Sequence, residues 1–168
     1  MFKKEAIKER KEFNNELYNK IFKITKKPGI ILDLGCGLNP LSFPYKDIAY
    51  LASDIDVEAM RKVKKHFKKN KIRGEVFYFD LNNTKELKKI KKVDIALMFK
   101  VLDDLDKKTI KEALNNIKTK YFVVSFATRT ISGKRMNSPK RTWFEKLIKS
   151  KICNKIRYFN EVFYVIKK

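Results

Sequence analysis

Short apolar runs alternate with lysine-rich stretches of helical periodicity along most of this chain, and that alternation limits the folds it can adopt. An amphipathic helical pattern opens the sequence and ends at Pro28-Gly29. Apolar runs of strand length then cover 30–34, 49–53, 75–79, 93–99 and 121–126, while helical patterns cover 57–70, 84–91, 107–117 and 139–150. This alternation favours a mainly parallel sheet with helices on both faces, which is an α/β fold.

The C-terminal part of the sequence departs from this alternation. The segment "NKIRYFNEVFYVIKK" contains two strand-like runs that meet around Asn160 without a helical pattern between them. It therefore predicts a closing antiparallel hairpin. With 168 residues, 43% of them hydrophobic, the chain is long enough for one sizeable core and too short for two ordinary ones. We expect a single domain over residues 1–168, with the helix of residues 1–27 packed on it.

The glycine-rich turn "ILDLGCGLNP" at 31–40 is the strongest local signal of a ligand site. Gly35 and Gly37 let the backbone approach a ligand closely, at the carboxyl edge of the sheet where such folds bind ligands. Asp54 follows about 20 residues later, where a carboxylate can accept hydrogen bonds from ribose hydroxyls. Pro40 stands where a dinucleotide fingerprint has its third glycine, so the pattern predicts a nucleoside and not a dinucleotide.

A large basic surplus indicates a polyanionic partner. The chain has 41 Lys and Arg against 19 Asp and Glu, a formal net charge of +22. Lysine-rich usage also arises from genome composition or from adaptation to high temperature, in which case the charges are only solvated. A surplus this large, however, gives nucleic-acid binding without sequence preference. We therefore expect a nucleic acid as the partner.

The sequence carries no pattern typical of a membrane, secreted or metal-binding protein. Its longest apolar stretch, "YFVVSFA", is far too short to span a bilayer, and its first residues lack the apolar core of a signal peptide. Cys36 and Cys153 lie far apart without metal-type spacing, and Cys153 is expected to be a buried thiol. The single histidine, His66, lies on a basic helical face and is expected at the surface. We expect a soluble, cytoplasmic protein without a metal.

The glycine turn, the later acids and the closing hairpin resemble the class I S-adenosylmethionine-dependent methyltransferases, whose first motif is E/D-x-G-x-G. Four longer stretches, "LDLGCGLNPL", "MFKVLDDLD", "VVSFATRTISGKRM" with "WFE" after it, and "NEVFYVIKK", are similar to the Arm/Rmt family of aminoglycoside-resistance 16S rRNA guanine N-7 methyltransferases. The resemblance runs from about Ile7 to the C-terminus and lacks the family's N-terminal helical domain. It implies a Rossmann-like fold with a mainly parallel seven-stranded sheet, S-adenosyl-L-methionine as cofactor, and ribosomal RNA or the small ribosomal subunit as substrate.

The same resemblance implies which residues hold the cofactor. Asp33 matches the acid of the first motif, Asp54 the acid that binds the ribose, and Asp80 the acid that reads the adenine amine. Arg10 matches a residue that reaches the carboxylate end of the cofactor. The complete implied set is Arg10, Asp33, Gly35, Gly37, Asp54, Ile55, Asp80 and Leu81.

Guanine N-7 has an in-plane lone pair and no proton, so its methylation needs alignment and exclusion of water but no general base. The positioning residues are expected where two parallel strands end, at Phe99, Lys100, Ser125, Phe126 and Arg129. An aromatic ring there can stack on an extruded guanine, and Arg129 can bind phosphate or the guanine edge. Alternatively, Phe99 and Phe126 are core residues. The basic loop from Arg129 to Arg141 is expected to face the substrate, and Trp143 to anchor the helix after it.

The leading hypothesis is an S-adenosylmethionine-dependent RNA methyltransferase that acts on guanine N-7 in ribosomal RNA. One alternative is a methyltransferase of the same fold that acts on transfer RNA or on a small molecule. Another is a non-catalytic RNA-binding or assembly factor that keeps the fold. The acids Asp54 and Asp80 disfavour the non-catalytic protein, and the net charge of +22 disfavours a small-molecule substrate.

Overall fold

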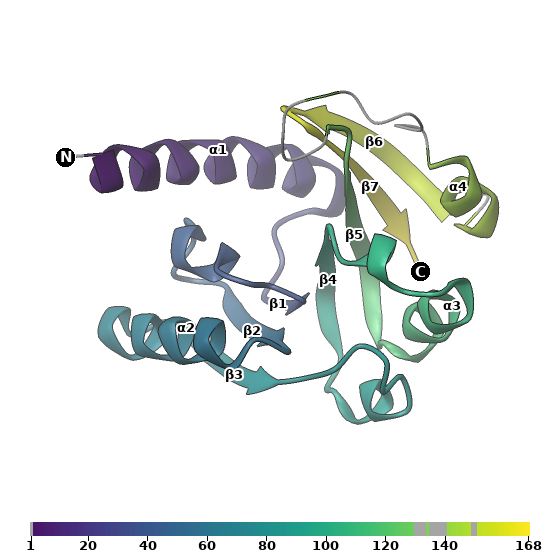
Figure 1. Ribbon diagram of the computed structural model, residues 1–168, viewed down its shortest axis with the longest axis horizontal. Helices are drawn as coiled ribbons and strands as arrows, with labels where there is room; N and C mark the ends of the chain where they lie inside the picture. The colour runs from purple at the N-terminus through teal and green to yellow at the C-terminus, as the bar shows by residue number, and fades with distance from the viewer. Residues whose placement is uncertain (1, 130–133, 135–140, 149–150) are drawn as a thin grey trace.

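One sheet of seven strands organises the part of the chain that the computed structural model describes, which is residues 2–129, 134, 141–148 and 151–168 (Figure 1). Its strands are β1 (Ile30–Leu34), β2 (Ala49–Asp54), β3 (Gly74–Tyr78), β4 (Val93–Phe99), β5 (Thr119–Ala127), β6 (Ile152–Tyr158) and β7 (Glu161–Lys167). Their order in the sheet is β3-β2-β1-β4-β5-β7-β6. The first five strands are parallel, and β7 runs antiparallel to both β5 and β6. The predicted parallel sheet and closing hairpin are both confirmed.

Helices cover both faces of this sheet, as predicted. The α-helices are α1 (Phe2–Thr25), α2 (Val57–Asn70), α3 (Lys107–Asn116) and α4 (Thr142–Ile148), and the 3-10 helices are η1 (Asn39–Ser42), η2 (Glu86–Lys89) and η3 (Leu102–Asp104). In Figure 1, α1 and α2 lie on one side of the sheet and α3 and α4 on the other. Each side chain on a strand therefore packs toward one of two helical layers.

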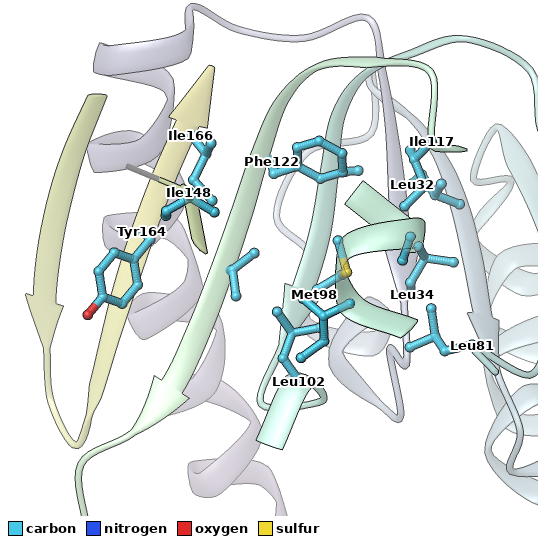
Figure 2. Close-up of a cluster of buried hydrophobic side chains, with 14 of the residues drawn as sticks. Leu32, Leu34, Leu81, Met98, Leu102, Ile117, Phe122, Ile148, Tyr164 and Ile166 are labelled. Carbon is cyan, nitrogen blue, oxygen red and sulfur yellow. The ribbon is translucent and has the colours of Figure 1, made fainter. Parts of the chain in front are cut away.

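The alternation of side chains along the strands supplies both cores. In β1, Ile31 belongs to the cluster packed against α1 and α2, and its neighbour Leu32 belongs to the cluster packed against α3 and α4. Figure 2 shows part of the second cluster, in which Ile148 from α4 lies beside Tyr164 and Ile166 of β7. Because both faces are buried, the central strands are almost continuously apolar.

Aspartate N-caps explain where two helices begin. Asp56 accepts hydrogen bonds from the backbone N–H groups of Glu58 and Ala59 at 2.9 and 3.0 Å, which starts α2 directly after β2. Asp106 caps α3 in the same way through the N–H of Thr109 at 2.8 Å. The first of these caps fixes the direction in which the chain leaves the carboxyl end of β2.

Several local expectations need correction. The pattern at 84–91 forms only the four residues of the 3-10 helix η2, and the glycine turn leads into another short 3-10 helix, η1. Cys153 is exposed, not buried, because it lies on the edge strand β6. For the helical pattern predicted at 139–150, the structure describes a helix from Thr142 to Ile148, and residues 139, 140, 149 and 150 lie outside the described residues. None of the helices in the described ranges combines the length and the apolar character of a membrane span.

Candidate cofactor and substrate site

A cleft of about 510 Å³ opens at the edge of the sheet where the parallel strands end. Its walls come from the glycine turn after β1, from Phe99 and Lys100 at the end of β4, and from α1 and the start of β7. The strands β1 and β4 are neighbours although β2 and β3 separate them in the sequence. The order of the strands reverses at this point, which is where doubly wound sheets bind ligands.

Gly35 and Gly37 shape the floor of the cleft for different reasons. Gly35 has φ +68°, and a Cβ atom built on it would lie 2.3 Å from Cγ1 of Val101. Gly37 has φ +49° with open space around the position of a Cβ atom. The first glycine is thus required by packing and conformation, and the second by conformation alone. Because neither glycine has a side chain, the backbone itself forms the surface of the cleft at both positions.

Asp33 lies under this turn with one oxygen paired and the other unpaired. Its Oδ2 accepts hydrogen bonds from the hydroxyl of Tyr50 at 2.5 Å and from Nδ2 of Asn39 at 3.0 Å. Its Oδ1 is the one buried side-chain polar atom without a hydrogen-bond partner in the described part of the chain. Burial raises the pKa of Asp33 to about 6, against the hydrogen bonds from Tyr50 and Asn39, which lower it. A buried acceptor without a donor, beside a cleft, is a feature that a ligand donor can satisfy.

Asp54 ties the end of β2 to the glycine turn. Its Oδ2 accepts a hydrogen bond from the backbone N–H of Gly37 at 2.7 Å, and its Oδ1 accepts one from the N–H of Asp56 at 2.9 Å. The next side chain, Ile55, is 59% exposed, which is unusual for a large aliphatic residue after a buried strand. The structure thus brings Asp54 to the turn as the sequence predicts.

Two of the remaining three members of the implied cofactor set, Asp80 and Leu81, lie farther along the sheet edge. Asp80 lines a separate cavity of about 580 Å³ beside the edge strand β3, together with Phe77 and Phe79. Its Oδ1 accepts hydrogen bonds from the backbone and side chain of Asn82. Leu81 is 8% exposed and packs in the core with α3 and α4, so its side chain contributes to packing. The side chain of Arg10 lies outside the described residues.

Lys100 and Ser125 meet at a carboxylate that the sequence analysis did not include. Glu161 accepts a hydrogen bond from Oγ of Ser125 through Oε2 at 2.9 Å, and its Oε1 pairs with Nζ of Lys100 at 3.0 Å. Lys100 has φ +58°, and its backbone N–H donates to the carbonyl of Ser125 at 3.0 Å. The position of Glu161 in the sequence could have indicated this contact. Glu161 is the first residue of β7, which runs antiparallel to β5, so it pairs with Ala127 at the carboxyl end of β5.

The two candidate aromatic residues have different surroundings. Phe99 is half-buried, lines the cleft and packs edge-on against Phe163 with ring centroids 5.3 Å apart. Phe126 has no exposed surface and packs against Trp143 and Phe144 on the opposite face of the sheet. The stacking role predicted for Phe126 is therefore wrong, and its alternative as a core residue holds. The ring contact with Phe126 also supports the prediction that Trp143 is an anchor.

The basic loop contributes fewer surface cations than predicted. Arg141 is 6% exposed and forms two hydrogen bonds to the carboxylate of Asp103, at 3.1 and 2.8 Å. A buried guanidinium held in this way stabilises the fold and does not face a substrate. Arg129, at the other end of the loop, is exposed beside the end of β5. Lys140 and Arg135 lie outside the described residues.

The sequence model of the family described as "Ribosomal RNA methyltransferase (FmrO)" matches residues 1–163. This chain belongs to the FmrO family of ribosomal RNA methyltransferases. Two relatives of this FmrO-family chain are the proteins named 16S rRNA (guanine(1405)-N(7))-methyltransferase from Proteus mirabilis and Serratia marcescens. The first is 30% identical over 178 residues and the second 31% identical over 170 residues. Each alignment covers 97% of this chain, but only 62% and 66% of the two relatives, which is less than two thirds of their length.

Solved structures of similar proteins share the fold of this FmrO-family chain. The 16S rRNA methylase ArmA superposes with a TM-score of 0.72 at 28% identity, over 95% of this chain and 84% of that one. The 16S rRNA methyltransferase RmtF, solved in complex with S-adenosyl-L-homocysteine, superposes with a TM-score of 0.77 at 23% identity. That alignment covers 96% of this chain and 64% of RmtF. The Rossmann-like methyltransferase fold implied by the sequence is confirmed.

Proposed function

We propose that this FmrO-family protein is an S-adenosylmethionine-dependent methyltransferase that modifies N-7 of a guanine in ribosomal RNA. The observation that carries the proposal is the extent of the family match. Residues 1–163 include the glycine turn, the Lys100 position and Glu161, so the match covers every wall of the cleft. A protein that acts on ribosomal RNA works in the cytoplasm, where we place this one.

The cleft fits the cofactor on its own chemistry. The buried Oδ1 of Asp33 lacks a donor, and the methionine end of S-adenosylmethionine carries an ammonium group that can supply one. Gly35 and Gly37 leave room for a ligand against the backbone, and Asp54 stands at the end of β2 as an acceptor for ribose hydroxyls. Arg10, Ile55, Asp80 and Leu81 complete the proposed cofactor set through the resemblance to the Arm/Rmt family.

The protein's task in the reaction is to position the guanine against the methyl group and to exclude water. When bound, S-adenosylmethionine supplies a methyl group on a sulfonium ion that is already reactive toward a lone pair. Because guanine N-7 carries no proton, the chain needs no base. Lys100, held by Glu161 at the mouth of the cleft, supplies positive charge and a donor for the guanine edge or a phosphate. Ser125 is a positioning residue, since its hydroxyl is bonded to Glu161. Phe99 lines the cleft, and Arg129 offers an exposed cation after β5.

Transfer of labelled methyl groups tests this function directly. The protein is incubated with labelled S-adenosylmethionine and, in parallel, with small ribosomal subunits, naked ribosomal RNA and transfer RNA. We expect label on ribosomal RNA. It should become a site of strand cleavage after reduction and aniline treatment, because methylation at N-7 places a fixed positive charge on the imidazole ring. Label on ribose or on an exocyclic amine contradicts the N-7 assignment, label on transfer RNA alone contradicts the substrate, and no label on any RNA contradicts the activity.

Calorimetry on the aspartates tests the cofactor site separately. Asp54→Ala should weaken S-adenosylmethionine binding by about tenfold or more, because it removes a charged acceptor and the brace on Gly37. Asp47→Ala is the matched control, since Asp47 is an exposed carboxylate paired with Lys27 and does not line the cleft. Equal affinities for the wild type and Asp54→Ala would remove the proposed site.

A further inference from the structure

The β6–β7 hairpin turns on an exposed phenylalanine whose backbone has an unfavourable conformation. Phe159 is 78% exposed, the highest value among the exposed large hydrophobic side chains in the described part of the chain. Its φ is +51°, in the left-handed region that favours glycine or asparagine and that bulky residues rarely occupy. Neither burial nor turn geometry accounts for a phenylalanine at this position.

Contacts on both sides hold Phe159 beside the cleft. Its ring lies 5.0 Å from the ring of Phe13, in an edge-to-face arrangement, and Phe13 lines the cleft. The next residue, Asn160, accepts a hydrogen bond from the backbone N–H of Thr128 at 2.7 Å, which ties the turn to the end of β5. Glu161, which pairs with Lys100 in the cleft wall, follows directly. The turn is therefore fixed to three parts of the site.

Phe159 also contacts the ring of Tyr158 at 5.1 Å, but the other two candidate aromatic residues at the site expose less of their rings. Phe126 is fully buried, and Phe99 packs edge-on against Phe163. Phe159 presents most of its ring to solvent. Arg157, two residues before it, is exposed, and Glu161, two residues after it, pairs with Lys100. An exposed aromatic ring on a strongly basic protein is a feature by which proteins hold unpaired nucleic-acid bases.

We propose that Phe159 is the platform on which an RNA base stacks after it has left its helix at the mouth of the cleft. The inference rests on the proposed function and adds a specificity-determining residue to it. Duplex bases are stacked on each other and cannot use this ring, so Phe159 selects RNA with unpaired bases. The strained backbone of the turn is consistent with selection for the ring, because a glycine would form the turn with less strain.

The variant Phe159→Gly separates this role from a structural one. It removes the ring and relieves the left-handed strain, so its unfolding midpoint should equal or exceed that of the wild type. Its affinity for an RNA hairpin with unpaired guanines in the loop should fall about tenfold, while its affinity for a fully paired RNA of equal length should change less than twofold. Phe159→Trp should restore hairpin binding, and the affinity for S-adenosylmethionine should stay unchanged in both variants.

Lys26→Gly is the control for the backbone effect, because Lys26 has φ +65°, is exposed and does not line the cleft. It should leave the preference for the hairpin intact. An equal loss of affinity for hairpin and duplex, or no loss in Phe159→Gly, overturns the inference. A drop in its unfolding midpoint below that of the wild type shows a structural role and also overturns it. These binding readouts do not depend on turnover, so absence of methyl transfer by the wild type counts against the proposed function and not against the stacking platform.

Discussion

Asp33 is the residue whose surroundings most clearly favour the binding of a ligand. Its Oδ2 is held by Tyr50 and Asn39, while its Oδ1 is buried without a partner. Burial raises the pKa of the carboxyl group to about 6, so near neutral pH the ligand-free protein holds a buried negative charge at a cost in stability. A cationic group at Oδ1 would offset that cost. Stability and ligand binding are thus coupled through one carboxyl group.

The first prediction concerns the pH dependence of stability. Because the pKa of Asp33 is about 6 in the folded protein and 3.8 in the reference state, the folded protein binds a proton more tightly. Its contribution is fully present below about pH 4 and is lost as pH rises through about 6, by about 3 kcal/mol. Asp33→Asn should abolish this dependence in urea unfolding of the ligand-free protein. Asp47→Asn should not, because the ion pair with Lys27 lowers the pKa of Asp47. Parallel pH profiles for the wild type and Asp33→Asn would contradict the prediction.

Residues that are neighbours in the sequence show the limit of prediction at this scale. Ser125 and Phe126 are both expected at the site because both end the same strand, but adjacent strand residues face opposite sides of a sheet. Ser125 bonds to Glu161 beside the cleft, and Phe126 packs in the other core. Glu161 was missed because it lies 36 residues from Ser125, and only the antiparallel register brings the two together. In contrast, Asp33, Gly35 and Gly37 lie within five residues of each other, so a local sequence motif predicts them.

At the scale of elements, the segments with strong periodicity were predicted well and those with competing turn chemistry were not. The bounds of α2 and β4 agree with their patterns. The segment 84–91 has a helical pattern, yet its first residue is held by long-range bonds. Oγ1 of Thr84 donates to Glu112, and its carbonyl accepts from Asn116. These contacts with α3 turn the chain early, so only the short η2 forms. Tertiary contacts of this kind cannot be read from local sequence.

The turn between β1 and η1 gives a prediction with an internal control. Gly35→Ala should lower the unfolding free energy by about 2–4 kcal/mol, because the added methyl group meets Val101 and the backbone is left-handed. Gly37→Ala should cost only about 1 kcal/mol, since its surroundings are open. Adding Val101→Ala to Gly35→Ala should recover part of the loss. Denaturant unfolding of the wild type, these three variants and Val101→Ala alone measures the coupling. Equal effects at both glycines would show that packing on Val101 does not matter.

At the scale of the whole molecule, the charge indicates a polyanionic partner but not the face that would bind it. The net charge of +22 is spread along the chain. The structure adds that the cleft opens toward α1, since Phe13 and Leu17 of that helix line it, and α2 covers the same face of the sheet. Because α1 and α2 lie on one side of the sheet and α3 on the other (Figure 1), we expect an RNA at the cleft to contact α2 more than α3.

The third prediction tests this asymmetry through the salt dependence of RNA binding. The exposed lysines Lys62, Lys64 and Lys65 of α2 are changed together to Gln, and the exposed lysines of α3, Lys107, Lys108 and Lys111, serve as the matched triplet. The α2 triplet should reduce the slope of log affinity against log salt by about 2, because each lost phosphate contact releases one counterion fewer. The α3 triplet should change the slope by much less. Equal effects of the two triplets would contradict a face-specific contact, and a flat response in the wild type would contradict RNA as partner.

The hydrogen bond between Glu16 and Tyr158 can form only late in the synthesis of the chain. These residues are 142 positions apart, so at about 5–20 residues per second the ribosome needs on the order of 10 s to make the second after the first. The later half of α1 can already pack on Tyr50 and Phe67 within that interval. The earlier half of α1, which carries Phe13, can pack only after the β6–β7 hairpin has been made. Until then its apolar side is exposed to water and to chaperones. Synthesis of the chain therefore leaves one wall of the cleft unmade until its closing strands emerge.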